Sequence, residues 1–277
     1  MTLRRLLLAL ACLPALIGAP AAANPPMFWD SKERLPRPDL SELPRLRFLT
    51  TTDFPPFNYL DGNGRLSGFH VDLARAICAE LEITEKCQIQ ALPWTELVEA
   101  LGQGNGEAIL AGIAVTEQTR AIYAFSRPYL QFPGRFVMPR STAVSEPVAD
   151  RLAGKRVGVI ARSGHERLLR DHFPGLQPVT YTRREWLYDD LLNGKIDAAF
   201  DDGMRLAFWL AGSASKGCCR FAGGPYLAPD YFGTGMAIVV RPDDVDLRQA
   251  LDSALQQIAV KGTFAELYLR YFPISFF

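Results

Sequence analysis

The chain has 277 residues, enough for one large domain or for two smaller lobes. Hydrophobic residues make up 48% of the chain and charged residues 22%, which is ordinary for a globular protein. The formal net charge is zero and Lys and Arg form no run, so no overall field attracts nucleic acid or an anionic membrane. These properties exclude classes of protein but select no function.

The first 23 residues have the pattern of a secretory signal peptide. Arg4 and Arg5 precede an apolar stretch at 6–17, and small residues up to Ala23 form a cleavage pattern. A retained membrane anchor is the alternative, but the apolar stretch is shorter than the roughly 20 residues that span a bilayer. We therefore expect an exported protein in the periplasm.

Four cysteines remain after the predicted signal peptide, an even number for an oxidising compartment. Cys78 lies on a helical pattern and Cys87 opens the next apolar segment, which favours a disulfide between them. Cys218 and Cys219 are adjacent, and form either a vicinal disulfide or two free thiols. No histidine stands at zinc-ligand spacing from either pair, so we predict structural cysteines, no metal and no cofactor.

The first half of the chain predicts an arm followed by an α/β unit. Residues 24–45 are rich in proline and lack periodicity, which predicts an extended, poorly ordered arm. A strand at 46–50 leads into a loop that Pro55 and Pro56 make rigid. Apolar residues at helical spacing predict a helix over 69–81, and a shorter helix is expected after Trp94.

The stretch from 106 to 129 is the centre of the predicted site. Its apolar run at 108–115 is short enough for a strand buried on both faces, and Thr116 then begins a short helix with Glu117 in the first turn. A buried parallel strand that feeds a helix leaves free backbone N–H groups at a crevice. A small polar ligand can bind there.

A second alternation of strands and helices follows, which predicts an α/β fold with parallel sheets. Extended segments near 135–140 and 231–235 indicate two crossovers between two lobes. The predicted divisions are a signal peptide at 1–23, an arm at 24–45, lobe 1 at 46–136 and 233–277, and lobe 2 at 137–232.

Five segments, in this order, match one family pattern. They are Phe54-x-Pro56-Phe57, residues 68–73, residues 93–101, residues 111–129 and residues 261–268. From residue 46 onward the chain thus resembles periplasmic solute-binding proteins of the polar amino-acid type, the receptors of ABC importers. The resemblance implies a type II periplasmic binding fold, with two mostly parallel sheets flanked by helices and joined by two crossovers. It also implies a monomer that meets a permease.

The resemblance further implies how an amino acid would be held. Family members usually meet the α-carboxylate with an arginine three residues after the position of Thr116, and the α-amine with a carboxylate matched here by Asp202. Thr119 stands at the arginine position, and Arg120 comes one residue late, which turns a helical side chain by about 100°. Either Arg120 or Arg162 still reaches the carboxylate, or the ligand is an amine or a modified amino acid.

Other candidate ligand-binding residues are aromatic or small. Phe54 and Trp94 match positions where the family packs rings on the ligand, and Ala111 and Gly112 offer backbone groups. In lobe 2 the candidates are Ser163, Gly164 and His165, and the histidine could confer ligand choice or pH sensitivity.

Each of these residues also has a structural alternative. Trp94 could cover the core, Arg120 could be a solvated charge, and Asp202 could cap a helix. His70 falls where the family usually has Asp, and we expect it at the surface.

The predicted function is capture of a small polar ligand, most simply an amino acid or related amine, by closure of the two lobes. One alternative is a receptor that docks on a sensor or dehydrogenase partner, for which the arm at 24–45 is a candidate. Another is an enzyme on the same fold, similar to cyclohexadienyl dehydratase, with Asp202 and His165 as an acid/base pair. We predict no enzyme, because no other catalytic motif is visible.

Overall fold

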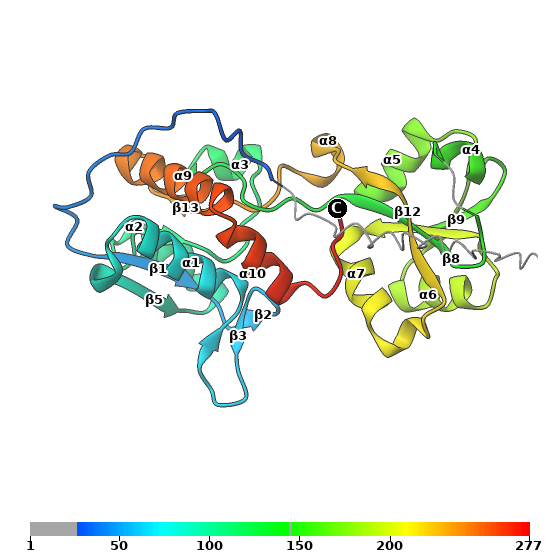
Figure 1. Cartoon of the computed structure of the whole chain (residues 1–277), viewed down its shortest axis with the longest axis horizontal. Coiled ribbons are helices and arrows are strands. Elements are labelled where there is room, and N and C mark those ends of the chain that lie inside the picture. Colours follow the sequence, from blue (N-terminus) through cyan, green and yellow to red (C-terminus); the bar gives the residue numbers. More distant parts are fainter. Residues whose placement is uncertain (1–26, 144–145) are drawn as a thin grey trace, which may run out of the picture.

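The computed structural model describes residues 27–143 and 146–277, so the predicted signal peptide at 1–23 lies outside the described residues. Two five-stranded sheets form the centres of two lobes, which lie side by side and are joined by extended segments (Figure 1). Lobe 1 contains the first and last elements, and the middle of the chain forms lobe 2. Within the described ranges, no helix combines the length and apolar content needed to cross a bilayer.

Lobe 1 has the strand order β5-β1-β6-β13-β7. β1 pairs in parallel with β5 and β6, whereas β13 is antiparallel to β6 and β7. The strands are β1 (Leu46–Thr50), β5 (Cys87–Ala91), β6 (Ala108–Ile109), β7 (Ala124–Phe125) and β13 (Val239–Val240). A small second sheet contains β2 (Asp53–Phe54), β3 (Asn58–Leu60) and β4 (Leu66–Ser67).

Helices cover both faces of the lobe 1 sheet. Side chains of α1, α9 and α10 pack on one face and those of α2 on the other. The helices are α1 (Phe69–Glu80), α2 (Leu97–Gly102), α3 (Glu117–Arg120), α9 (Val245–Val260) and α10 (Thr263–Tyr271), with single 3₁₀ turns η1 (Thr84–Lys86) and η2 (Trp94–Glu96). In α1, Phe69, Leu73 and Ile77 recur every four residues and are fully buried, which explains the helical period of this segment.

Lobe 2 repeats this plan with the strand order β10-β9-β11-β8-β12. Its strands are β8 (Gly134–Pro139), β9 (Arg156–Ile160), β10 (Gln177–Tyr181), β11 (Ala198–Asp202) and β12 (Cys219–Tyr226). Its helices are α4 (Val148–Leu152), α5 (Gly164–His172), α6 (Arg184–Leu192), α7 (Gly203–Ala211) and α8 (Pro229–Phe232), with a 3₁₀ turn η3 (Ser213–Ser215). The predicted α/β class is therefore confirmed, with mixed sheets in which the three parallel strands lie furthest from the crossovers.

The connection between the lobes differs from the prediction in two ways. β8 already belongs to the lobe 2 sheet from Gly134, so the expected boundary at 136 falls inside this strand. In addition, the chain after α10 runs from lobe 1 to lobe 2. There the Phe276 carbonyl accepts a hydrogen bond from Nη1 of Arg135, which lies on β8, at 3.1 Å. The C-terminal segment therefore forms a third connection beside the two crossovers.

Both cysteine pairs are joined. Cys78 and Cys87 form the predicted disulfide, which links the end of α1 to the start of β5. Cys218 and Cys219 form a vicinal disulfide at the start of β12, which decides between the two alternatives that the sequence allowed.

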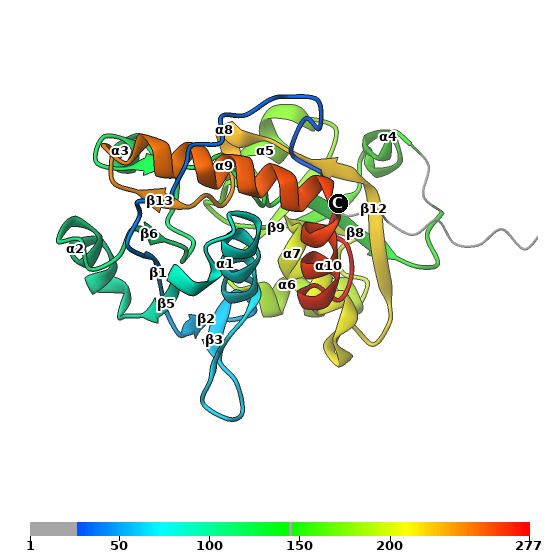
Figure 2. The same cartoon turned by 60° about the vertical axis from the view of Figure 1, so that its left-hand side comes forward.

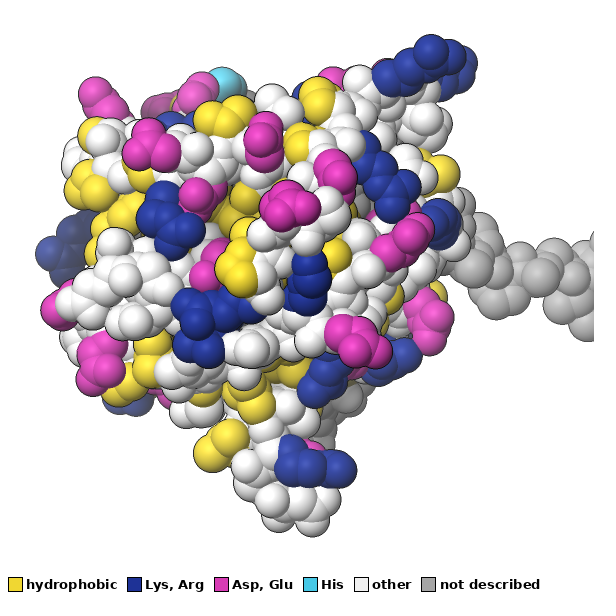
Figure 3. Space-filling view, turned by 90° about the vertical axis from the view of Figure 1, so that its left-hand side faces the viewer, with side chains coloured by type: hydrophobic (Ala, Val, Ile, Leu, Met, Phe, Trp, Pro, Cys, Tyr) yellow, Lys and Arg dark blue, Asp and Glu magenta, His cyan; other side chains and the backbone are white. Residues whose placement is uncertain are grey.

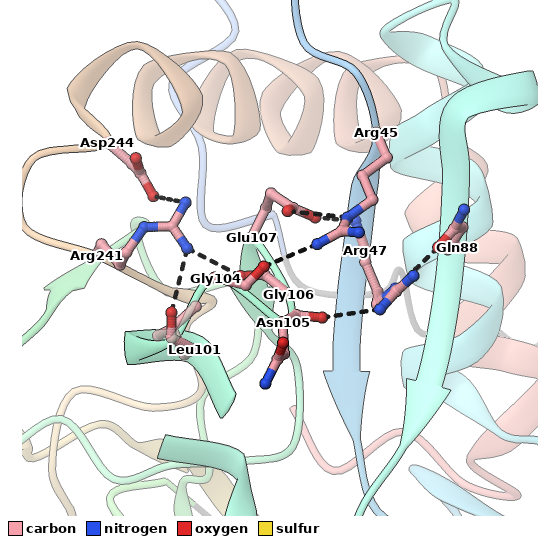
Figure 4. Close-up of polar contacts among 10 residues, drawn as sticks. All are labelled: Arg45, Arg47, Gln88, Leu101, Gly104, Asn105, Gly106, Glu107, Arg241 and Asp244. Atoms are coloured by element: carbon pink, nitrogen blue, oxygen red, sulfur yellow. Dashed lines mark hydrogen bonds and ion pairs between the residues drawn. The ribbon is translucent and has the colours of Figure 1, made fainter. Parts of the chain in front are cut away.

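Three arginines hold the loop between α2 and β6, as Figure 4 shows. Guanidinium groups of Arg45, Arg47 and Arg241 donate to backbone carbonyls within residues 101–106 over 2.8–3.2 Å. Glu107 pairs with Arg45 at 3.2 Å, and Asp244 lies 2.9 Å from Arg241. This cluster fixes the start of β6, whose other end leads to the predicted site. On the outer end of lobe 1, acidic and basic side chains are interspersed, in keeping with the zero net charge (Figure 3).

His70 was wrongly expected at the surface. It lies on α1 but is only 1% exposed, and its Nδ1 and Nε2 atoms each lie 2.8 Å from a partner, Asn58 Oδ1 and the Tyr129 hydroxyl. Asn58 in turn donates to the Thr51 hydroxyl at 2.6 Å. Because Asn58 Oδ1 only accepts, Nδ1 carries the proton and Tyr129 donates to Nε2. The histidine therefore connects β3, and through Asn58 the loop after β1, to the segment after β7.

The described part of the arm, residues 27–45, has neither helix nor strand but packs on lobe 1 rather than lying free (Figures 1 and 2). Trp29 is 7% exposed and belongs to the lobe 1 core. Nε2 of Gln256 on α9 donates to the carbonyls of Asp30 and Glu33 at 2.7 and 2.9 Å. Arg127 donates two hydrogen bonds, of 2.6 and 2.7 Å, to the Glu33 carboxylate. One buried ring and these polar contacts, rather than a periodic pattern, position the arm.

We expect Gln256→Leu to loosen this arm and to lower the free energy of unfolding by about 1–2 kcal/mol, because two backbone carbonyls lose their donor. Limited proteolysis should then cut the chain within residues 27–45 faster than in the wild type. The neighbouring Gln257→Leu is the matched control, since Gln257 makes no side-chain hydrogen bond within the described residues. Equal cleavage rates in both variants would contradict the role assigned to Gln256.

Candidate functional site

The predicted ligand residues lie at or after the carboxyl ends of parallel strands in both lobes. Side chains at such strand ends gather at one edge of a sheet, where α/β proteins commonly bind ligands. A cavity of about 490 Å³ lies between the loop with Pro55 and Pro56 in lobe 1 and helices α6 and α7 in lobe 2. Both lobes therefore contribute to a hollow next to the predicted site.

In lobe 1, Phe54 and Gly112 lie against each other. The Phe54 ring stacks on Phe57 with centroids 4.8 Å apart, and a Cβ atom on Gly112 would come within 2.9 Å of the Phe54 ring. Gly112 also has φ +81°, a conformation that favours glycine. Ala111 is buried, whereas Trp94 is 53% exposed at the start of η2, so its ring does not cover the core.

Thr116 and Thr119 form a closed capping box at α3. The Thr116 hydroxyl accepts from the Thr119 amide at 3.2 Å, and the Thr119 hydroxyl accepts from the Thr116 amide at 2.9 Å. The Thr119 hydroxyl also donates to the Ala114 carbonyl at 2.8 Å. Arg120 is exposed, with its guanidinium carbon 5.9 Å from the centre of the Phe125 ring. The position of the family's arginine is therefore occupied by a threonine engaged in local bonds, and Arg120 packs away from it.

In lobe 2, Ser163 and Gly164 begin α5. The Ser163 hydroxyl accepts from the Glu166 amide at 3.1 Å, and the Glu166 carboxylate accepts from the Arg162 amide at 2.7 Å. The two caps fix the turn after β9, in which Arg162 has φ +58° and an exposed side chain. A Cβ atom on Gly164 would clash with the backbone oxygen of Tyr231, so α5 begins in direct contact with α8.

His165 belongs to the aromatic packing of lobe 2. Its ring stacks on Phe232 with centroids 4.4 Å apart and lies edge-on to Phe200 at 5.7 Å. Burial lowers the pKa of His165 to about 4, so the ring is neutral near pH 7. Among the described residues His165 makes no hydrogen bond to Asp202, and the two do not form the acid/base pair of the enzyme alternative.

Asp202 ends β11 and caps α7. Its Oδ1 accepts from the Arg205 amide at 2.9 Å, whereas Oδ2 has no hydrogen-bond partner within the described ranges. Burial, with a smaller contribution from the neighbouring Asp201 carboxylate, raises the pKa of Asp202 to about 6. A desolvated carboxylate with one free oxygen is suited to a cationic partner. The capping alternative and the ligand role are thus compatible.

The sequence did not reveal that Asp201, the residue next to Asp202, forms an ion pair with Arg184. Asp201 is 0% exposed and accepts from Nε of Arg184 at 2.8 Å and from the Tyr188 hydroxyl at 3.3 Å. Arg184 is the first residue of α6. The one sign of this ion pair in the sequence is the adjacent aspartates at 201–202, because a carboxylate that becomes buried needs a cationic partner.

The two halves of the predicted site do not contact each other. Within residues 27–143 and 146–277, no hydrogen bond or ion pair joins Phe54, Trp94, Gly112 or Thr116 to Ser163, His165 or Asp202. The same residues contain no group of His, Cys, Asp and Glu arranged to hold a metal. Two α/β lobes with the predicted ligand residues divided between them are the arrangement of a two-lobed binding protein.

Comparison with known proteins agrees with this class. Residues 46–274 match the model of bacterial extracellular solute-binding proteins, family 3, and the chain belongs to this family. It is 32% identical to the putative ABC transporter arginine-binding protein 2 of Escherichia coli K12 over 227 residues, 82% of this chain and 90% of that protein. It is 28% identical to the histidine-binding periplasmic protein of the same strain, over 83% of this chain and 88% of that one. It is therefore a binding protein of the solute-receptor type, not an enzyme.

Two solved structures show the same fold. The L-cystine solute receptor of Neisseria gonorrhoeae, in its unliganded open conformation, has a TM-score of 0.70 at 17% identity and covers 82% of this chain and 92% of its own. The second substrate-binding domain of Lactococcus lactis GlnP, also open, has a TM-score of 0.67 at 17% identity, over 84% of this chain and 97% of its own.

Proposed function

We propose that this protein is a periplasmic receptor that captures an amino acid or a related amine and delivers it to an ABC permease in the inner membrane. Relatives named as arginine-binding and histidine-binding proteins support the ligand class. We further propose that it is exported through cleavage of residues 1–23 and acts as a monomer. The observation that carries the proposal is Asp202, a largely desolvated carboxylate with a free oxygen at the end of β11.

The proposed mechanism is closure around the crossovers. The ligand first binds lobe 1, where the exposed Trp94 ring and the Phe54 ring beside Gly112 offer an apolar surface. Lobe 2 then brings the start of α5, with Ser163 and Gly164, and the Asp202 carboxylate onto the ligand. Closure pairs the ligand amine with Asp202 in a site that excludes water, which strengthens their interaction. The closed surface is what the permease would recognise.

For the alternative receptor, which docks on a sensor or dehydrogenase partner, the arm at 24–45 was the candidate docking segment. Residues 27–45 instead contact lobe 1 through Trp29, Gln256 and Arg127. This packing favours the permease-linked receptor over the partner-docking alternative.

A thermal-shift screen tests the proposal. The protein is heated with each of the common amino acids, with their decarboxylated amines and with small organic acids. A ligand at 100 times its dissociation constant adds about 2.7 kcal/mol to the free energy of unfolding. We expect at least one amino acid or amine to stabilise the wild type and to lose this effect in Asp202→Asn. No stabilisation by any amine-bearing compound would overturn the proposed function.

A further inference from the structure

The cavity between the lobes has one apolar wall and one charged wall. Two prolines line it from lobe 1, and six residues line it from α6 and α7: Pro55 and Pro56, and Arg184, Glu185, Tyr188, Met204, Arg205 and Phe208. Glu185 is the one carboxylate in this lining, and its exposed side chain lies 3.5 Å from Arg183, so the cavity wall keeps a net positive charge. Its volume, about 490 Å³, is within the range of small-molecule sites. It adjoins both predicted halves of the site, because Phe54 precedes Pro55 and Asp202 begins α7.

Arg184 is held in this cavity wall by two hydrogen bonds to one carboxylate. Nε donates to Asp201 Oδ2 at 2.8 Å and Nη2 to Asp201 Oδ1 at 3.3 Å. Asp201 is itself fixed on β11 and fully buried, so the plane of the guanidinium is set before any ligand arrives. Within the described residues Nη1 makes no hydrogen bond, and the Arg184 side chain is 35% exposed.

A guanidinium oriented in this way is suited to bind an anion. Arginine binds a carboxylate best when its geometry is fixed, because less side-chain freedom is lost on binding. Neutralising Asp201 occupies Nε and Nη2 only, which leaves the two N–H bonds of Nη1 for another partner. Arg184 can therefore pair with Asp201 and bind a second anion at the same time.

Arg184 is also within electrostatic reach of the other lobe 2 site residues. Burial raises the pKa of Asp202, and the charge of Arg184 partly opposes this rise. Burial lowers the pKa of His165, and Arg184 lowers it further. The charge of Arg184 therefore affects both Asp202, the predicted partner of the ligand amine, and His165, at the start of α5.

We propose that Arg184 binds the carboxylate of the ligand, in place of the arginine that α3 lacks at Thr119. The cavity beside Pro55 and Pro56 is then the carboxylate subsite. This inference rests on the proposed function, and it selects a ligand with both an amine and a carboxylate rather than a simple amine. Asp202 and Arg184 hold the two charges from lobe 2, and Phe54 and Trp94 in lobe 1 contact the remainder.

The test compares binding of an amino acid with binding of its decarboxylated amine. The probe pairs are arginine and agmatine, histidine and histamine, and lysine and cadaverine, measured by isothermal titration calorimetry. Removing Arg184 alone would leave Asp201 buried and unpaired, so the informative variant is Arg184→Met combined with Asp201→Asn. Asp201→Asn alone keeps the guanidinium, and Arg183→Gln removes an equal charge beside Arg184 from an exposed residue that does not line the cavity.

We expect the wild type to prefer one amino acid over its amine. The double variant should lose roughly 100-fold in affinity for the amino acid and little for the amine, so that the preference disappears. Arg183→Gln should keep the preference in full, and Asp201→Asn, which leaves Arg184 in place but less firmly oriented, should keep part of it. A folded double variant that still prefers the amino acid would overturn the proposal, as would loss of the preference in Arg183→Gln.

Failure of this inference differs from failure of the proposed function. A wild-type protein that binds amines but no amino acid overturns the role of Arg184 and leaves an amine receptor. A wild-type protein that binds neither member of any pair, and no compound of the thermal-shift screen, overturns the receptor function itself. Circular dichroism of the double variant shows whether its fold is kept.

Discussion

Replacing His70 with leucine is expected to lower the free energy of unfolding by about 2–5 kcal/mol, although His70 is buried behind the Phe54 ring and is not itself a proposed ligand contact. The substitution leaves Asn58 Oδ1 and the Tyr129 hydroxyl buried without their partner. Each unsatisfied buried polar group costs about 1–3 kcal/mol. Urea unfolding at pH 7.5 measures the effect.

Two further variants make this result specific. His172→Leu is the matched control, because His172 is exposed on α5 and should change stability by less than about 0.5 kcal/mol. Tyr129→Phe removes only the donor to Nε2 and should cost about 1–2 kcal/mol. The effects of His70→Leu and Tyr129→Phe should not add, because the two residues share a hydrogen bond. Equal stability of His70→Leu and His172→Leu would show that the buried network contributes nothing.

The same histidine should make the protein sensitive to acid. Burial lowers the pKa of His70 to about 3, against about 6.5 in an unfolded chain. The unfolded chain therefore binds more protons between pH 6.5 and 3, so the stability present above pH 6.5 falls as the pH drops through this window. The slope due to one such group is at most about 1.4 kcal/mol per pH unit. His70→Leu should reduce the slope between pH 6 and 4, and an unchanged slope would contradict the neutral, buried state.

The sequence predicted local features of the fold well. The cap at Thr116 and the helical period at 69–81 each depend on neighbours within a few residues, and each is present. The strand expected over 108–115 is much shorter, since β6 covers only Ala108–Ile109 and Ala114 is exposed. Cys78 and Cys87 form the disulfide that was predicted from their places on a helix and at the start of the next apolar segment. Such local features can be predicted from the sequence because backbone propensity and the burial pattern favour the same structure within a single turn or strand.

Contacts between distant segments were not predictable in the same way. His70 meets Tyr129 across 59 positions, and Arg184 meets Asp201 across 17, between elements that sequence alone does not place together. The arm lacked a hydrophobic period, so a single buried ring, Trp29, gave no signal of docking. For the candidate site, the sequence therefore located strand ends and helix caps. It did not indicate Arg184, the residue that we propose as the partner of the ligand carboxylate.

Asp202→Asn is expected to weaken binding of amine-bearing ligands roughly 100-fold or more at pH 7.5, because a desolvated charge pair loses one partner. Asparagine is as good an N-cap as aspartate, so the start of α7 should be preserved. Any loss of affinity then reports the charge rather than the fold. Calorimetric titration with the amino acid or amine found in the screen measures it.

The raised pKa of Asp202 gives this prediction a pH signature. Its pKa is about 6 in the unliganded protein and must fall when an ammonium group binds, because the ionised form is then stabilised. Below pH 6 the ligand has to displace a proton, so affinity should fall by up to tenfold per pH unit and binding should release up to one proton. The Asn variant should show neither effect. Wild-type affinity that is constant from pH 7.5 to 4.5 would show that the amine binds elsewhere.

The same shift predicts an opposite effect on the unliganded protein. A carboxyl group whose pKa is raised on folding contributes stability that is present below about pH 4 and lost as the pH rises through about 6. Asp202→Asn should therefore unfold at a higher temperature than the wild type at pH 7.5 without ligand. With saturating ligand the order should reverse, because only the wild type gains from binding. A residue that destabilises the empty receptor and stabilises the filled one acts on the ligand, since a residue that served only as a cap would leave both melting temperatures nearly unchanged when replaced by asparagine.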